Sequence, residues 1–161
     1  MTSPVETSTR GGVLHVCINR PEKRNALSMA TLDAIAAAFA AAADDDELRL
    51  AVLTGAGDKS FAAGGDLKEL ASVKGEEAAV AMATHAKAAL STVRNFPLPV
   101  IAALNGDALG GGAELAMACD MRVAASHARI GFIQGKLGIT SAWGGGVDLM
   151  CLIGQARALQ M

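Results

Sequence analysis

The chain has 161 residues with a formal net charge of −2, and 52% of them are hydrophobic against 19% charged. This apolar content is enough to fill a core, so it excludes a disordered chain, and the length suits one domain. The nearly balanced charge and the 3% aromatic content argue against a surface for nucleic acid or anionic lipid. The sequence therefore predicts a globular domain that binds something small.

The cysteines and the start of the chain bear on its compartment. Cys17, Cys119 and Cys151 are odd in number and far apart, which argues against a disulfide framework. The first ten residues are polar and lack the apolar segment of a secretory signal peptide. No apolar run reaches the ~18 residues of a membrane span. We therefore expect a cytoplasmic location.

Strand and helix patterns alternate along the chain, which predicts an α/β domain. Two continuous apolar runs, 50–54 and 100–104, predict strands that are covered on both faces. The acidic run 44–47 predicts a solvated loop. The remaining expected elements are strands at 13–18 and 121–124, a helix from the cap Ser28 to about Ala43, a helix at 76–95, a helix through Cys119 and a helical end.

Several common site motifs are absent from the sequence. There is no G-x-x-x-x-G-K-[ST], G-x-G-x-x-G, G-x-S-x-G, C-x-x-C or H-E-x-x-H. His15, His85 and His127 each stand alone, so we expect them at the surface or behind a site rather than on a metal. The motifs therefore give no indication of a metal or a cofactor.

Two segments share one plan, in which a buried strand leads to a glycine-rich turn and then a helix. The first turn is Phe61 to Asp66 and the second is Gly110 to Glu114. A glycine run at a helix start exposes backbone N–H groups in a positive potential. Two such turns facing each other would offer two donors to one oxygen, which is an oxyanion hole. Alternatively, these glycines only allow close packing of helix and strand.

Glu114 is the most suggestive titratable residue because it lies about one helical turn after Gly111, among Ala113, Leu115 and Ala116. A carboxylate in such apolar surroundings suits proton transfer near neutral pH. The alternative is a carboxylate that only complements the helix dipole. Asp66 and Asp120 stand beside structured turns, and we expect them to act as caps or turn acceptors.

At these residues the sequence resembles the crotonase (enoyl-CoA hydratase/isomerase) superfamily. Each matching stretch is weak alone, but the set runs in order through nearly the whole chain and is specific. The stretches are 19–28 (NRPEKRNALS), 60–68 (SFAAGGDLK), 99–106 (PVIAALNG), 112–116 (GAELA) and 119–124 (CDMRVA).

The resemblance implies a spiral of repeated ββα units over residues 1–161, continued in other members by a helical C-terminal region. It implies homotrimers or hexamers and an acyl-CoA thioester as substrate, with no separate cofactor. The thioester oxygen would sit between the N–H groups of Gly65 and Gly111, with Glu114 as the proton-transfer residue. Residues implied near CoA or the substrate are Lys23, Arg24, Ala26, Leu27, Ala63, Asp66, Leu67 and Gly110.

One departure concerns the second catalytic glutamate of the hydratase pattern, which falls at Gln134. An amide can hold a water molecule but cannot transfer a proton at neutral pH. The stretch from Leu137 to Gly146, which includes Trp143, is closer to the branch that decarboxylates short branched malonyl-CoA thioesters. A neutral Gln134 would also avoid repulsion of a substrate carboxylate. Trp143 either contacts the substrate or simply packs in the core.

Three hypotheses therefore stand. The leading one is an acyl-CoA enzyme of the hydratase/isomerase type that stabilises a thioester enolate. The second is a methylmalonyl- or ethylmalonyl-CoA decarboxylase. The third, from a different class, is an acyl-CoA binder or an inactive fragment without catalysis, prompted by Gln134 and by a chain end that reads as the middle of a helix.

Overall fold

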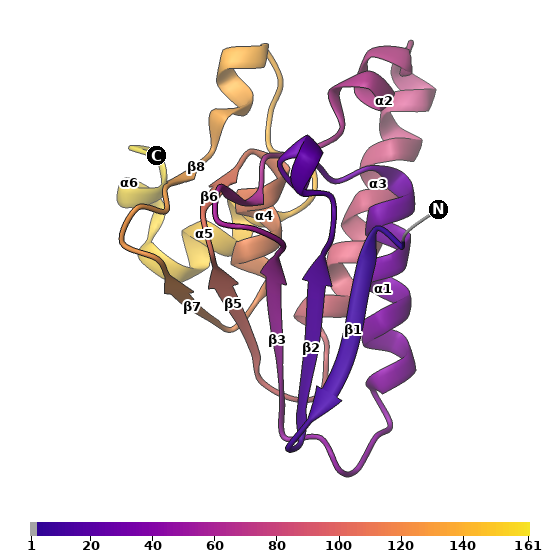
Figure 1. Cartoon of the computed structure of the whole chain (residues 1–161). Helices are drawn as coiled ribbons and strands as arrows, with labels where there is room; N and C mark the ends of the chain where they lie inside the picture. Colours follow the sequence, from indigo (N-terminus) through magenta and orange to yellow (C-terminus); the bar gives the residue numbers. More distant parts are fainter. Residues whose placement is uncertain (1–2) are drawn as a thin grey trace.

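A computed structural model describes residues 3–161 as a twisted sheet with helices packed against it (Figure 1). Five strands form this sheet in the order β1-β2-β3-β5-β7. β1 and β2 form an antiparallel hairpin, and the other neighbours are parallel. The strands are β1 (Val5–Arg10), β2 (Val13–Ile18), β3 (Leu50–Gly55), β5 (Val100–Leu104) and β7 (Met121–Ala124).

A second, smaller sheet is parallel throughout and has the order β4-β6-β8. Each strand of it directly follows a strand of the large sheet, and helical structure comes next. This repeat confirms the predicted spiral of ββα units. The strands are β4 (Ser60–Ala62), β6 (Asp107–Leu109) and β8 (Ile130–Gly131).

The helices follow the strands along the chain. The predicted helix that begins after Ser28 is confirmed, because the Ser28 hydroxyl accepts a hydrogen bond from the Thr31 N–H and caps it. The longer helices are α1 (Met29–Ala42), α3 (Glu76–Arg94), α4 (Gly111–Ala118) and α5 (Gly145–Ile153). The short ones are η1 (Pro21–Lys23), α2 (Leu67–Ser72), η2 (Ile133–Leu137) and α6 (Gln155–Ala158).

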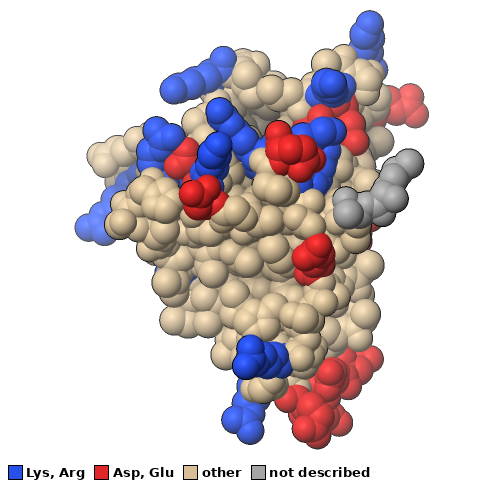
Figure 2. All heavy atoms as spheres, in the orientation of Figure 1, with Lys and Arg blue, Asp and Glu red and all other residues tan. Residues whose placement is uncertain are grey.

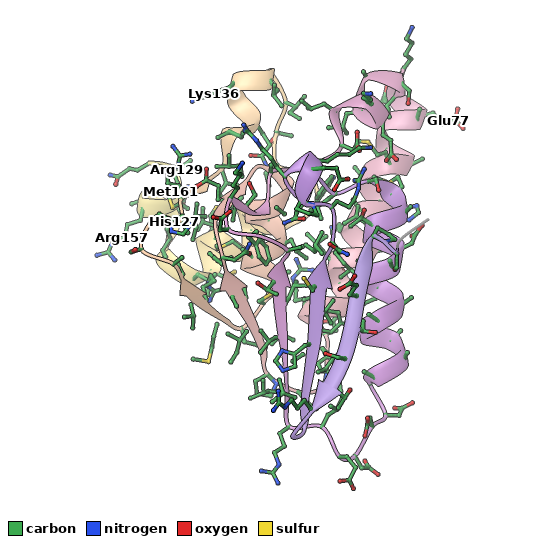
Figure 3. All side chains as sticks on the ribbon, viewed as in Figure 1. Glu77, His127, Arg129, Lys136, Arg157 and Met161 are labelled. Atoms are coloured by element: carbon green, nitrogen blue, oxygen red, sulfur yellow. The ribbon has the colours of Figure 1, made fainter. Side chains whose placement is uncertain are left out.

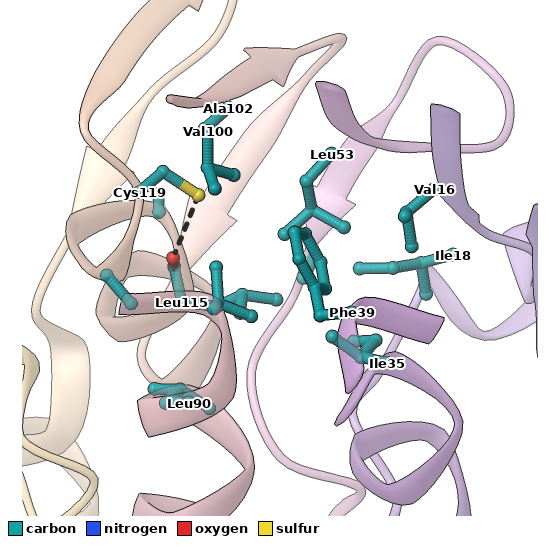
Figure 4. Close-up of a cluster of buried hydrophobic side chains, with 14 of the residues drawn as sticks. Val16, Ile18, Ile35, Phe39, Leu53, Leu90, Val100, Ala102, Leu115 and Cys119 are labelled. Carbon is teal, nitrogen blue, oxygen red and sulfur yellow. Dashed lines mark hydrogen bonds between the residues drawn. The ribbon is translucent and has the colours of Figure 1, made fainter. Parts of the chain in front are cut away.

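The core lies between the large sheet and the helices α1, α3 and α4 (Figure 4). Phe39 of α1 is fully buried and meets Phe96 edge to face, with ring centroids 5.1 Å apart. On the other side of the cluster, Leu115 of α4 is also fully buried, and its carbonyl accepts a weak hydrogen bond from the Cys119 thiol. Burial raises the pKa of that thiol to about 12.

The prediction that strands 50–54 and 100–104 are covered on both faces is wrong for this chain. In β3 and β5, fully buried residues alternate with partly exposed ones. The physical reason is that the helices cover only one face of the sheet. The apolar residues on the second face, such as Val52 and Ile101, are only half-buried.

The strand β1 was not among the predicted elements. Its six residues carry one buried side chain, Val5, and five exposed ones, so the strand lacks an apolar pattern. It is held instead by backbone pairing with β2 from Val5↔Ile18 to Arg10↔Val13. A strand at a sheet edge that is held by backbone hydrogen bonds therefore need not show an apolar pattern in its sequence.

On the face shown in Figure 2, charged side chains gather toward the two ends, and few lie between them. The acidic run 44–47 is exposed in the loop between α1 and β3, as predicted. Lys136 projects outward from η2 at the opposite end of the molecule (Figure 3). Across residues 3–161, no helix combines the length and apolar character needed to cross a membrane.

Candidate active site

The two glycine turns leave neighbouring parallel strands of the small sheet. Ala62 of β4 pairs with Ala108 of β6; the first turn begins within β4, and the second begins just after β6. The turns touch, because a methyl group placed on Gly64 would lie 3.3 Å from the Leu109 carbonyl oxygen and 3.8 Å from the Gly111 nitrogen. The topology therefore brings together two segments that are 46 residues apart along the chain (65 to 111).

Both turns present unoccupied backbone donors. Among the hydrogen bonds of residues 3–161, none has the N–H of Gly65 or of Gly111 as its donor. Gly111 is the first residue of α4, where the helix has no partner for that N–H. Both glycines line one cavity of about 480 Å³. Free donors in a cavity can bind an oxygen atom of a ligand.

Glu114 follows the second turn on α4, a helix in which every residue is buried. Its side chain is 2% exposed and lines the same cavity. One oxygen, Oε2, accepts three hydrogen bonds of 3.0 Å, from the Ser141 hydroxyl and the N–H groups of Trp143 and Gly145. The other oxygen, Oε1, accepts one bond of 2.9 Å from Nε2 of Gln134.

The expected apolar surroundings of Glu114 are therefore wrong. Its sequence neighbours are apolar, but its donors all come from residues 134–145, which fold back onto α4. The N–H of Gly145 opens α5, so the carboxylate also lies at a helix N-terminus. Gly145 has no room for a side chain, because a methyl group there would lie 2.7 Å from Glu114 Cγ.

Gln134 is buried, and only one of the two polar atoms of its side-chain amide has a hydrogen-bond partner. Its Nε2 donates to Glu114, which fixes the orientation of the amide. Its Oε1 is the buried side-chain acceptor without a partner among residues 3–161. Since a buried acceptor without a partner costs about 1–3 kcal/mol, a ligand that can donate a hydrogen bond would be favoured here.

The cavity contains many of the residues that the sequence analysis singled out, and it adds others. Its floor is the pair of turns with Glu114 and Gln134, and its walls are mostly apolar side chains of α2, α3, η2 and the segment just after η2, most of which were not predicted from the sequence. Several of these, such as Leu137 and Ile139, are more than half exposed. No local motif marks these wall residues in the sequence, because their exposure is a property of the fold. The predicted residues that line it are Ala63, Gly65, Leu67, Gly110, Gly111, Glu114, Gln134 and Trp143.

Five predicted residues lie outside the cavity lining. Lys23 and Arg24 are exposed, and Ala26 is half-buried. Leu27 has a fully buried side chain in the core, so only its backbone, which accepts from the Asp66 N–H, lies beside the first turn. Leu27 forms a β-bridge with Gly65, and this pairing directs the leucine side chain into the core and away from the cavity.

Asp66 is the cap of α2, as predicted, since its carboxylate accepts from the Lys68 N–H. It also forms a 2.9 Å ion pair with Arg20. The hydrogen bond from Arg20 holds the pKa of the Asp66 carboxyl below its ordinary value. Asp120 was also predicted as a cap or turn acceptor, but its carboxylate accepts from the Val100 N–H at the start of β5, 20 residues back along the chain, so it links two strands instead.

The fold and the cavity define an α/β protein with two free backbone N–H groups on adjacent turns and a buried carboxylate lining one cavity. Comparison with known proteins agrees with this class: the enoyl-CoA hydratase/isomerase family matches residues 8–161. The chain belongs to that family, within the crotonase superfamily.

Individual relatives cover the chain closely but are longer than it. A crotonyl-CoA hydratase from Syntrophomonas wolfei is 44% identical over 89% of the chain and 55% of its own length. A short-chain-enoyl-CoA hydratase from Clostridium acetobutylicum is 40% identical over 94% of the chain and 58% of its own length. The crystal structure of an enoyl-CoA hydratase/carnithine racemase from Magnetospirillum magneticum has a TM-score of 0.94 at 34% identity, covering 99% of the chain and 60% of that protein. The chain thus spans little more than half the length of these relatives.

Proposed function

We propose that the protein converts an acyl-CoA thioester through an enolate, with the N–H groups of Gly65 and Gly111 binding the thioester oxygen. The observation that carries this is the contact between the two turns, with both donors free beside one cavity. Negative charge develops on that oxygen in the transition state, so preorganised donors lower the barrier. Each such donor is typically worth about 100- to 1,000-fold in rate.

Within this mechanism, Glu114 is the group that moves the proton. Three donors on Oε2 anchor the carboxylate, while Oε1 has one donor and keeps a free lone pair. In hydration, Oε1 takes a proton from water as the oxygen adds to the β-carbon and the enolate forms. The carboxyl group then delivers a proton to the α-carbon, so the carboxylate is regenerated.

Gln134 supports this chemistry without exchanging protons. Its unpartnered Oε1 can accept one hydrogen of the attacking water while Glu114 accepts the other. Two acceptors facing one site favour a water molecule or a substrate hydroxyl. The reaction class supported best is therefore hydration, or the reverse dehydration, with a single carboxylate. The names of the relatives, crotonyl-CoA hydratase and short-chain-enoyl-CoA hydratase, agree with this class.

The second candidate is decarboxylation of a methylmalonyl- or ethylmalonyl-type thioester. It is favoured by the neutral Gln134 in place of a second carboxylate, since the cavity then carries one negative side chain. It is opposed by the orphan Oε1 of Gln134, which would face the substrate carboxylate as a second acceptor. An acyl-CoA binder without catalysis is the remaining alternative.

Turnover of two thioesters separates the candidates. We expect the protein to hydrate crotonyl-CoA, followed by loss of the enoyl thioester absorbance, and to release little carbon dioxide from methylmalonyl-CoA. Release of carbon dioxide without hydration would establish the decarboxylase instead. Calorimetric binding of CoA thioesters with no turnover would leave only the binder.

The substitution Glu114→Gln tests the proton-transfer residue. We expect crotonyl-CoA hydration to fall at least ~100-fold, because the amide cannot exchange a proton. Affinity for saturated butyryl-CoA, measured by calorimetry, serves as the control and should change little. A variant that hydrates at the original rate would remove Glu114 from the mechanism.

Assembly as a homotrimer or hexamer, a cytoplasmic location and the absence of a cofactor stay predictions from the sequence. So do the proposed contacts of Lys23, Arg24, Ala26, Leu27 and Asp66 with CoA. The exposure of Lys23 and Arg24 supports their part, since a phosphate can reach them from solvent.

A further inference from the structure

Trp143 stands against both of the proposed oxyanion glycines. A methyl group on Gly111 would lie 2.7 Å from Cη2 of the indole, and one on Gly65 would lie 3.4 Å from the same atom. The indole edge therefore spans the two turns. The side chain is 6% exposed and lines the cavity. Trp143 thus packs in the core, as one of the two sequence interpretations predicted, and it also lines the cavity where the other placed a substrate contact.

The backbone of Trp143 shows which end of a bound thioester the ring would meet. The Trp143 N–H donates to Oε2 of Glu114, so the indole leaves the chain beside the carboxylate. The proposed acid must lie close to the α-carbon, because it delivers a proton there. The residue therefore spans from the carboxylate that serves the α-carbon to the two glycines proposed to bind the carbonyl oxygen, which places the ring along the acyl side of the thioester.

We infer that Trp143 determines acyl specificity by forming the wall that limits the group attached to the thioester carbonyl. The inference rests on the proposed function and deepens it by naming the substrate class, which is thioesters with small acyl groups. The indole edge lies against both turns, and the backbone N–H of the same residue is bonded to the buried carboxylate, so a large movement of the ring would disturb these contacts. A longer or branched acyl group would have to displace it.

Chain-length preference in two variants tests this wall. Trp143→Ala and Trp143→Phe remove all or part of the indole while keeping the backbone N–H that holds Glu114. Each accommodated methylene is worth about fourfold, and we expect the space freed by removing the indole to hold about two of the four extra methylenes of octenoyl-CoA. We therefore expect the kcat/KM ratio of octenoyl-CoA to crotonyl-CoA to rise about tenfold in Trp143→Ala and less in Trp143→Phe.

Val147→Ala is the matched control for these variants. It removes an apolar side chain four residues further on that is 60% exposed and lies outside the cavity lining. Its chain-length ratio should equal that of the unmodified protein. Circular dichroism checks that each variant is folded. If folded Trp143→Phe shows an unchanged kcat/KM ratio of octenoyl-CoA to crotonyl-CoA, the inference is overturned even if Trp143→Ala fails to fold.

Fluorescence gives a readout that does not depend on turnover. Trp143 is the single tryptophan of the sequence, so intrinsic fluorescence reports this ring alone. Titration with saturated butyryl-CoA should change the emission more than free CoA does, and octanoyl-CoA should bind at least tenfold more weakly. Equal responses to CoA and butyryl-CoA, or tighter binding of octanoyl-CoA, would contradict the wall.

The two readouts separate the inference from the proposed function. If no thioester is turned over but butyryl-CoA is bound with the stated fluorescence change, the proposed function fails while the acyl wall stands. If crotonyl-CoA is hydrated but the chain-length preference is the same in the Trp143 variants, the proposed function stands and the inference about Trp143 is wrong.

Discussion

The two glycine turns reach the same cavity but are held in different ways. The second turn enters α4, where every residue is buried, and Gly112 packs directly against the Ala62 backbone. The first turn leads into α2, which buries none of its six residues. It is held by backbone bonds to Leu27 and by the Arg20–Asp66 pair. One donor is thus positioned by close packing and the other by polar links.

This difference teaches which kind of change each turn can tolerate. Close packing fails sharply when a single carbon is added, because backbone atoms cannot move aside. Polar links fail gradually, because each contributes little and water can replace it. The second turn should therefore be sensitive to volume, and the first to charge.

The largest effect is expected from adding a methyl group at the second turn. In Gly112→Ala, the new carbon would overlap the Ala62 carbonyl oxygen and lie 2.9 Å from the Ala62 side chain. Overpacking typically costs 1–3 kcal/mol, and the rigid neighbour here argues for at least ~3 kcal/mol of unfolding free energy. Urea denaturation measures it.

The matched control at the first turn is Gly64→Ala. Its methyl group would lie 3.3 Å from the Leu109 carbonyl oxygen, and the backbone φ of +102° is strained for alanine. We expect a loss of about 1–2 kcal/mol from that conformation. Equal losses in the two variants would remove the contrast between the turns.

A smaller effect, on activity, should separate the two donor glycines. In Gly111→Ala, the methyl group would push the indole of Trp143, and a displacement of about 1 Å can cost ~100-fold in rate. In Gly65→Ala, the nearest atom is the flexible tip of Leu70 at 3.0 Å, so a loss within tenfold is expected. Initial rates with crotonyl-CoA measure both.

A double variant checks the cause of that loss. Removing the indole with Trp143→Ala should restore part of the activity lost in Gly111→Ala, because the clash disappears. Interaction energies of this kind are expected for residues in direct contact. Strictly additive losses would show that the ring is not what Gly111 accommodates.

The smallest effect concerns the charge at the first turn. The pKa of Asp66 is lowered by Arg20, so its contribution to stability is present above the ordinary value of 3.8 and is lost as the pH falls through the lower folded value. Asp66→Asn should cost about 0.5–1 kcal/mol at pH 7. This difference from the unmodified protein should shrink below pH 3.8.

Urea denaturation at several pH values measures this dependence. The control is Arg20→Ala, in which the ion pair is already absent. Adding Asp66→Asn to that background should cost almost nothing at any pH. A full additional loss there would show that Arg20 is not the partner that matters.

The fold was predictable where local patterns and tertiary packing agree. The capped helix after Ser28 and the strand 13–18 both carry an apolar pattern on the face that is buried. β1 could not be found this way, because a polar edge strand is specified by its pairing partner. The faces of β3 and β5 were misjudged because apolar runs do not show how many helices will cover them.

The site was predictable in its positions and less so in its environment. The glycine turns and Glu114 could be found because each has a local signature at a helix start. The donors around Glu114 could not, because Gln134 and Gly145 lie 20 and 31 residues further along the chain. Their convergence depends on how the segment after β8 folds back, which no local pattern encodes.

The pairing of β4 with β6 has a consequence for how such a site can diversify. Neighbouring strands in a sheet lie about 4.8 Å apart whatever their side chains are. The two turns follow adjacent strands, so the separation of the turns is set by the backbone hydrogen bonds between those strands. Substitutions in the cavity walls can therefore change the shape of the cavity while the spacing of the two turns persists.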